Sequence, residues 1–237
     1  MPLQTVEPQR LYRQIAEQLR LLIAQGEFAL GARLPAERDL ATQLGVSRPS
    51  VREALIALEV EGVIEVRTGS GIYVKAMPGN TPAALASGPA EWGPLEVMSA
   101  RLLVEPEVAA LAAERATAEQ LQAVRAGLAL MKQAASEGRI PREGDEAFHE
   151  AIVQACGNGV LQDTVVRYLQ ARGGPLFERL GEYFESPESW QAAILEHEAV
   201  LAALEARDSG RTRSAMRSHL KQAHKRYSAS WRRAPAR

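Results

Sequence analysis

Apolar and polar positions alternate with two different periods in the amino-terminal third of this chain. Between residues 37 and 60 apolar side chains recur every three or four positions, which predicts two short amphipathic helices. Gly45 can take the positive φ that ends the first helix, and Ser47 is well placed to cap the second. Residues 63–66 and 72–74 then alternate with period two, which predicts two strands around a Gly-rich turn.

The second predicted helix begins with basic and hydroxyl side chains. Arg48 and Arg52 are four positions apart and so point in one direction, with Ser47 and Ser50 nearby. Arginine can hold guanine O6 and N7 with two hydrogen bonds, and serine and arginine also bind phosphates. The order helix, glycine turn, helix and flexible wing predicts a winged helix-turn-helix DNA-binding domain. We place this domain at residues 1–75, with the helix-turn-helix at about 37–56 and the wing at 63–75.

The composition changes after this domain. Pro, Gly, Ala and Ser dominate residues 76–93, which predicts a linker. Beyond it only helical periodicity remains, so we expect a mainly α protein whose second domain, residues 94–233, is an all-α helical bundle. The expected helices are 94–116, 118–137, 141–156, 158–172, 174–185, 188–206 and 208–233. The expected core stripes are Leu102, Leu103, Val108 and Leu111, then Leu121, Val124, Leu128 and Met131.

Composition and charge narrow the class of protein. No apolar run approaches the length of a membrane span and the amino terminus lacks an export signal, so we expect a cytoplasmic protein without membrane contact. Cys156, the only cysteine, suits a buried position in a reducing compartment. The net charge is −1, and residues 1–76 hold nine basic and nine acidic residues. DNA affinity must therefore depend on where the charges lie, with Glu17, Glu27, Glu59 and Glu61 expected away from the DNA.

A second constellation lies in the helical domain. Asp145 and His149 are one helical turn apart, so both can reach one ion from one face. His197 and His219 lie on helices expected to surround the same interior, whereas His224 is expected in solvent. Spacing alone leaves two interpretations open, a metal site or ordinary hydrogen-bonded histidines.

The sequence around the predicted helix-turn-helix is similar to a known family. Residues 31–38, 46–48, 51–55 and 69–74 closely resemble the amino-terminal domain of the GntR superfamily of bacterial transcriptional regulators. The resemblance implies that Arg38, Arg48, Arg52 and Gly69 touch the operator, assisted by Arg33 and Thr68.

The helical domain carries a matching resemblance. Asp-x-x-Phe-His at residues 145–149, Glu-His at 196–197 and Met-x-x-His at 216–219 resemble the FCD-type effector domain of the FadR-like branch of that superfamily. The resemblance implies that Asp145, His149, His197 and His219 bind a divalent metal ion. Three imidazoles and a carboxylate without a thiolate suit zinc or nickel, with manganese as an alternative.

Three further residues are candidates for effector binding. Arg101 resembles the family's arginine on the first helix of this domain and could pair with a carboxylate, or it could be a surface arginine paired with Glu105. Asn158 resembles another recurrent family position, although Asn beside Gly is also an ordinary helix stop. Arg172 is a further candidate of the same kind.

These features predict a metal-dependent, ligand-responsive repressor that is not an enzyme. Two-fold symmetry of a homodimer would match a palindromic operator in double-stranded DNA. The expected effector is a small carboxylic or sugar acid, because residues 174–190 loosely resemble regulators of hexuronate or aldonate use. A hydrolase with Glu146, Glu150 or Glu198 as base would not explain residues 37–75, and an architectural DNA-binding protein would need no metal cavity. The roughly 140 residues of the second half are too few for an aminotransferase-like domain.

Overall fold

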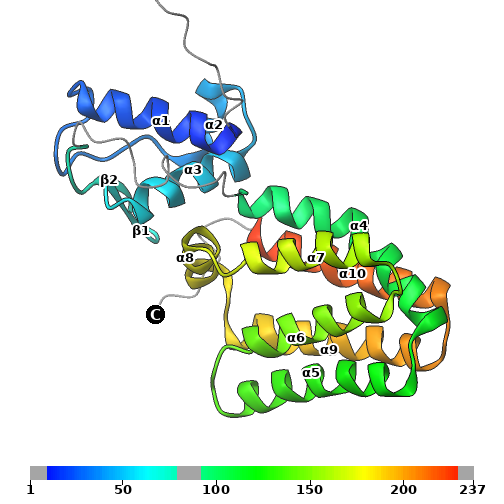
Figure 1. Ribbon diagram of the computed structural model, residues 1–237. Coiled ribbons are helices and arrows are strands. Elements are labelled where there is room, and N and C mark those ends of the chain that lie inside the picture. Colours follow the sequence, from blue (N-terminus) through cyan, green and yellow to red (C-terminus); the bar gives the residue numbers. More distant parts are fainter. Residues whose placement is uncertain (1–9, 79–91, 229–237) are drawn as a thin grey trace, which may run out of the picture.

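The computed structural model describes residues 10–78 and 92–228 of the protein. This part of the chain is mainly helical, with a small winged domain at the amino terminus and a helical bundle after it (Figure 1). The predicted linker therefore lies largely outside the described residues, as do the last residues of the predicted final helix, 229–233.

The amino-terminal domain is the predicted winged helix-turn-helix, preceded by one further helix. It consists of α1 (Leu11–Ala24), α2 (Glu37–Leu44), α3 (Arg48–Val60), β1 (Ile64–Arg67) and β2 (Gly71–Val74). Gly45 ends α2 with a φ of 65°, and the Ser47 hydroxyl caps α3 by accepting from the amide of Ser50. The two strands pair antiparallel. The sequence analysis did not single out α1, whose buried face completes the core of this domain.

Seven helices follow, and their ends lie within one residue of the predicted ends wherever the structure describes them, except that the last helix ends at Tyr227. They are α4 (Pro94–Arg115), α5 (Ala118–Ser136), α6 (Arg142–Ala155), α7 (Gly159–Ala171), α8 (Pro175–Phe184), α9 (Pro187–Glu205) and α10 (Ser209–Tyr227). Side-chain caps fix several starts, such as the capping box that Thr117 and Gln120 form at α5.

The bundle core agrees with most of the predicted apolar stripes. The stripe of α5, from Leu121 to Met131, is buried, as is Cys156. The α4 stripe is only partly right, because Val108 is buried whereas the Leu103 side chain is 75% exposed. The face of α4 that points into the bundle instead carries the charged residues Arg101 and Glu105.

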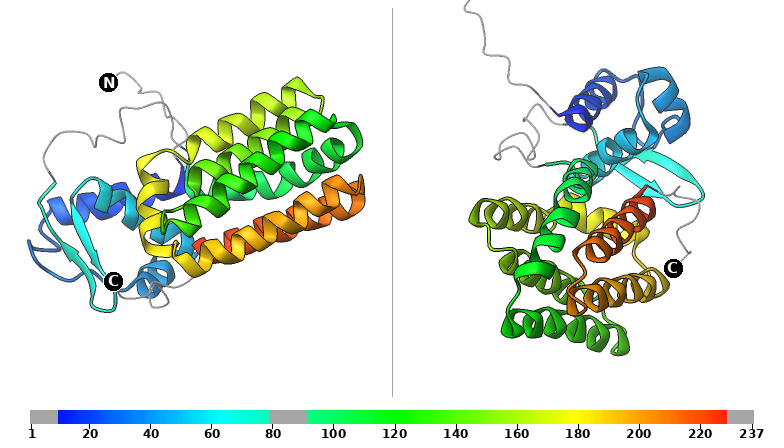
Figure 2. Two further views of the ribbon diagram at one scale, coloured as in Figure 1. Left: turned by 90° about the horizontal axis from the view of Figure 1, so that it is seen from below. Right: turned by 90° about the vertical axis from the view of Figure 1, so that its right-hand side faces the viewer.

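Helix α8 does not pack as the other helices of the bundle do. Its residues Leu176 and Leu180 belong to the same buried apolar cluster as the core of the winged domain. At the same face the Glu59 carboxylate of α3 accepts hydrogen bonds from Arg179 and Tyr183 of α8. Figures 1 and 2 show α8 lying between the winged domain and the remaining helices. The two halves of the chain are therefore joined through α8 as well as through the linker.

Candidate metal centre and DNA-binding face

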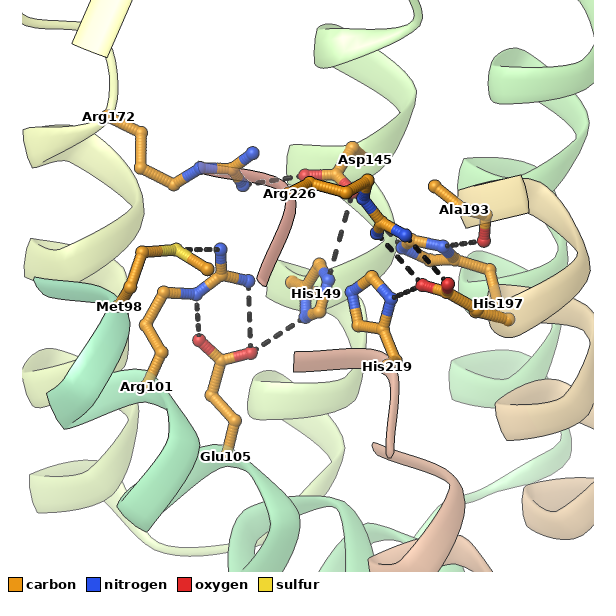
Figure 3. Close-up of polar contacts among 11 residues, drawn as sticks. Met98, Arg101, Glu105, Asp145, His149, Arg172, Ala193, His197, His219 and Arg226 are labelled. Carbon is orange, nitrogen blue, oxygen red and sulfur yellow. Dashed lines mark hydrogen bonds and ion pairs between the residues drawn. The ribbon is translucent and has the colours of Figure 1, made fainter. Parts of the chain in front are cut away.

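Four side chains from three helices meet inside the bundle. Asp145 and His149 lie one turn apart on α6, His197 comes from α9 and His219 from α10. All four are buried, and each offers one ligand atom within 4.8 Å of the others. Figure 3 shows the three imidazoles and the carboxylate gathered between these helices. The structure thus brings together the four residues that the sequence motifs indicated as metal ligands.

Neighbouring groups orient two of the imidazoles. Nδ1 of His197 donates to the carbonyl oxygen of Ala193 at 2.7 Å, one turn earlier on α9. Nδ1 of His219 lies 2.8 Å from Oε2 of Glu196. When one ring nitrogen is held in this way, the other ring nitrogen is oriented and free to bind a metal ion.

Unpaired nitrogens show that a cation fits this cluster. Among the described residues neither ring nitrogen of His149 nor Nε2 of His197 has a hydrogen-bond partner, although all three atoms are buried. Nδ1 of His149 lies 2.8 Å from Oε2 of Glu105, and Nε2 of His197 lies 3.1 Å from Oδ1 of Asp145, but neither approach has hydrogen-bond geometry. Buried polar atoms without partners are costly, and one divalent cation would satisfy Nε2 of His197 together with one ring nitrogen of His149.

Burial and neighbouring charges set the protonation of the cluster. Burial, together with the adjacent His197, lowers the pKa of His219 to about 3, and burial also lowers the pKa of His149. Burial opposes the charge of Asp145, but Arg172 at 2.6 Å and the nearby histidines hold the pKa of Asp145 well below its ordinary value. Neutral imidazoles beside an ionised carboxylate are the protonation states that bind a divalent metal.

A small cavity adjoins the cluster. Its volume is about 40 Å³, and Asp145, His219 and two of the predicted effector-binding residues, Arg101 and Arg172, line it. Arg101 is buried and donates to both oxygens of Glu105, at 2.5 and 3.2 Å (Figure 3). The pairing considered above as a surface alternative therefore exists, but it lies inside the bundle beside His149.

Asn158 is a correction to the predicted effector site. It is exposed at the amino end of α7, where its side chain accepts hydrogen bonds from the amides of Val160 and Leu161. It does not line the cavity. Its role in this structure is that of a helix cap, the ordinary reading of Asn beside Gly.

Several predicted DNA contacts line one groove of the winged domain. This groove has a volume of about 380 Å³ and lies between the start of α3 and the wing. Its walls include Arg33, Arg38, Arg48, Thr68 and Gly69. The Arg38 side chain is 80% exposed and that of Arg48 is 48% exposed, so both are accessible to a ligand. Just outside the groove, the predicted contacts Ser47 and Ser50 hydrogen-bond to each other at the amino end of α3.

Arg52 differs from its prediction. It does point in the same direction as Arg48, because both guanidinium groups bind the carboxylate of Glu37, but Arg52 is only 2% exposed. It also donates to the carbonyl oxygen of Tyr227 and lies against the ring of Phe184, both from the second half of the chain. Direct base reading by Arg52 is therefore incompatible with this conformation.

Sequence reasoning missed three acidic residues of these two sites. Glu37 organises the arginines of the groove, Glu196 holds His219, and Glu105 approaches Nδ1 of His149 at 2.8 Å. The signals for the last two were local, since Glu105 follows Arg101 by one helical turn and Glu196 directly precedes a predicted ligand. Glu37 gave no comparable signal, because its partners lie on another helix.

Comparison with known families matches both halves of the chain. Residues 11–74 match the gntR family of bacterial regulatory proteins, and residues 96–222 match the FCD domain. The chain is a GntR-family transcriptional regulator. The predicted fold class, a winged helix-turn-helix followed by an all-helical effector domain, is thereby confirmed.

Three transcriptional regulators that share 30% or more of their sequence with the chain support the same assignment. The regulator is 36% identical over 217 residues to the Uxu operon transcriptional regulator of Escherichia coli strain K12, covering 90% of the chain and 84% of that protein. It is also 36% identical over 224 residues to the Exu regulon transcriptional regulator of the same strain, covering 92% and 84%. The repressor NanR of Klebsiella aerogenes is 30% identical over 231 residues, covering 94% and 86%. A Streptococcus agalactiae GntR structure aligns at 25% identity with a TM-score of 0.48, covering 90% of the chain and 99% of that structure.

These families and relatives are transcriptional regulators and not enzymes. Glu146, Glu150 and Glu198, the positions considered as hydrolytic bases, are not among the residues that line the cavity. In the described part of the regulator, no helix is both long and apolar enough to cross a membrane.

Proposed function

We propose that the regulator is a repressor that leaves its operator when a small organic or sugar acid binds beside a divalent metal ion. Asp145, His149, His197 and His219 would hold the ion, with zinc or nickel expected and manganese as the alternative. The observation that carries this proposal is the set of buried, unpaired imidazole nitrogens facing an ionised carboxylate at the edge of a cavity.

Two arginines beside the cluster suit an acidic effector. Arg101 and Arg172 both line the cavity and are largely buried, so their charges are poorly screened by solvent. The bound ion would supply a Lewis acid that a carboxylate and an adjacent hydroxyl group can chelate together. Glu105 and Asp145 hold the two guanidinium groups in place before the effector arrives.

The repressor role is supported by relatives and by the DNA-binding face. NanR is named as a repressor, and the Uxu and Exu relatives regulate an operon and a regulon. A single winged domain of balanced charge binds DNA weakly, so we propose a homodimer that reads a palindromic operator with two α3 helices.

The effector part of this proposal is tested by metal removal and by a matched set of sugars. A duplex selected from random DNA by the metal-loaded regulator serves as the operator. D-glucuronate and D-gluconate are expected to raise the melting temperature of the loaded protein and to release the duplex, whereas glucose is expected to do neither. If stripped protein releases the duplex at the same acid concentration, the ion is not part of effector binding.

The DNA-binding part is tested at the groove. We expect Arg48→Ala to weaken operator binding by about 1–3 kcal/mol and to relax sequence preference, because we propose that this exposed side chain reads bases. Arg38→Ala should weaken binding to all duplexes alike, as loss of a phosphate contact does. Unchanged operator affinity of the Arg48→Ala protein would refute the groove as the DNA-binding surface.

A further inference from the structure

We propose that Arg52 is the positioning residue through which the effector cavity acts on the DNA-binding groove. This proposal rests on the proposed function for the identity of the molecule that fills the cavity. The contacts from which it is argued are contacts within the protein itself.

Arg52 is held from two sides. Within the winged domain, its Nε and Nη2 atoms donate to Glu37 at 2.9 and 3.0 Å. From the second half of the chain, the Tyr227 carbonyl oxygen accepts from its Nη1 atom at 3.2 Å, and the Phe184 ring centre lies 5.2 Å from the guanidinium carbon. A change on either side must therefore alter the position of this guanidinium.

The residues that hold Arg52 from the second side are also walls of the effector cavity. Phe184 and Tyr227 both line it, together with the predicted metal ligands Asp145 and His219. Glu185, another lining residue, accepts a hydrogen bond from the Tyr227 hydroxyl at 2.6 Å and so ties the end of α8 to the end of α10. One pair of residues thus contacts both the cavity and the arginine of α3, Phe184 through its ring and Tyr227 through its carbonyl oxygen.

The size of the cavity requires a wall to move. The cavity measures about 40 Å³, whereas an apolar cavity that binds one benzene molecule measures about 150 Å³. An acid with six or more carbon and oxygen atoms cannot enter this space unless the lining residues separate.

The wall at the ends of α8 and α10 is the one best placed to move. Two other lining residues, Arg101 and Asp145, are fixed by buried ion pairs with Glu105 and Arg172. Helix α8, in contrast, is short and divides its apolar residues, since Leu176 and Leu180 pack on the winged domain and Phe177 packs on α4 and α10. Filling the cavity would therefore push Phe184 and the Tyr227 carbonyl, and with them Arg52.

From Arg52 the displacement reaches the DNA-binding groove through Glu37. The same carboxylate accepts from Arg52 and from Nε of Arg48, the latter at 2.9 Å. Arg48 lines the groove and is exposed there. The chain of contacts thus runs from Phe184 and Tyr227 to Arg52, Glu37 and finally Arg48, which would lose its alignment with the operator.

A side chain that fills the cavity from within tests this chain of contacts without any effector. Ala223 lines the cavity on α10, and Ala223→Leu adds three carbon atoms to a cavity of about 40 Å³. We expect this full-length variant to bind the selected duplex roughly 5- to 150-fold more weakly, the range of a typical allosteric coupling. Ala193→Leu, from the α9 wall, provides a second variant should the first not fold.

Two matched variants separate this effect from loss of stability. Ala134→Leu overpacks a buried alanine of α5 away from the cavity, and should lower the melting temperature but keep operator affinity. Phe184→Ala combined with Ala223→Leu gives the added side chain room without pressure on Arg52. We expect this double variant to recover operator affinity to within about twofold of Phe184→Ala alone, whereas two independent defects would add.

The outcomes are distinct. Parent-like operator affinity of a folded Ala223→Leu or Ala193→Leu protein would overturn the proposal, as would failure of Phe184→Ala to restore binding. If the cavity-filling variants keep the operator affinity of the parent while an acid releases DNA from the parent, the proposed function stands and the role of Arg52 is wrong. If the variants weaken binding while no acid does, the role of Arg52 stands and the proposed effector is wrong.

Discussion

Glu53 of α3 places a carboxyl group at the amino end of α4. It accepts the amide of Leu95 at 2.5 Å, and it is 8% exposed. Burial raises the pKa of Glu53 to about 7 from its ordinary 4.5, the amide of Leu95 opposes that rise, and nearby Glu96 adds to it. Because the folded-state pKa is the higher one, the folded protein binds an extra proton between these values. The contribution of protonated Glu53 to the free energy of unfolding is fully present below pH 4.5 and is lost as the pH rises through about 7.

We expect Glu53→Gln to remove this loss, because glutamine can still accept the amide of Leu95 but carries no charge. In urea unfolding at pH 5 and pH 8, the free energy of unfolding of Glu53→Gln at pH 8 should exceed that of the parent by up to about 3 kcal/mol. Glu65→Gln, an exposed wing position, is the control and should follow the parent at both pH values. If the free energy of unfolding changes with pH equally in Glu53→Gln and in the parent, this pH dependence does not come from Glu53.

The four candidate ligands give a second prediction at the scale of single residues. His149→Ala and His219→Ala should each lose most bound zinc or nickel and lower the melting temperature of the loaded protein, since metal binding stabilises the bundle. His224→Ala should change neither quantity, because His224 is partly exposed on the far side of α10 from the cluster. Metal analysis that finds full occupancy in His149→Ala would refute the site.

Local motifs predicted these ligands, but not every partner. Asp145 and His149 are one turn apart on one helix, so their spacing in the sequence fixes their spacing in space. Arg52 and Glu37 belong to different helices, and their pairing depends on how α2 packs against α3. Periodicity carries no information on such a pair, which is why Arg52 was predicted to face DNA.

Whole helices were predictable because their ends carry chemical signals. Thr117, Ser186 and Asp208 accept amides at the starts of α5, α9 and α10, and glycine or proline marks other ends. The direction in which a helix faces was less predictable. Leu103 is exposed because the inner face of α4 holds Arg101 and Glu105 near the metal cluster, and a hydrophobic pattern cannot anticipate buried charges.

Asn158 gives a prediction at the scale of one helix. Asn158→Ala should lower the free energy of unfolding by about 1 kcal/mol, because α7 loses the side chain that accepts two of its first amides. Asn158→Ser should restore most of that stability. Neither change should alter the response of DNA binding to D-glucuronate or D-gluconate. A lost response with intact stability would return Asn158 to the effector site.

At the scale of the whole molecule, α8 links the two functions. Its amphipathic sequence predicted a helix, and the structure shows that Leu176 and Leu180 pack on the winged domain while Phe177 packs on the bundle. The sequence pattern could not indicate this partner, because any apolar surface satisfies such a face. Leu176 and Leu180 therefore follow the linker in the sequence but belong to the core of the winged domain.

Leu180 tests this shared core. Leu180→Ala should cost about 2–5 kcal/mol and should reduce hydrogen-exchange protection of α3, although Leu180 lies more than a hundred residues after that helix. Leu195→Ala, an exposed leucine of α9, should leave both quantities unchanged. Unaltered protection of α3 in a destabilised Leu180→Ala protein would show that the two halves unfold independently.

The position of α8 also constrains how such regulators can be recombined. A hybrid joined within residues 79–91 takes α3 from one parent and α8 from another, so Leu176 and Leu180 would meet a surface that did not evolve with them. New specificities built by exchanging amino-terminal halves would then fail through poor packing even where every DNA contact is intact. Hybrids that carry α8 together with the winged domain avoid this mismatch, so the exchangeable unit is discontinuous in the gene.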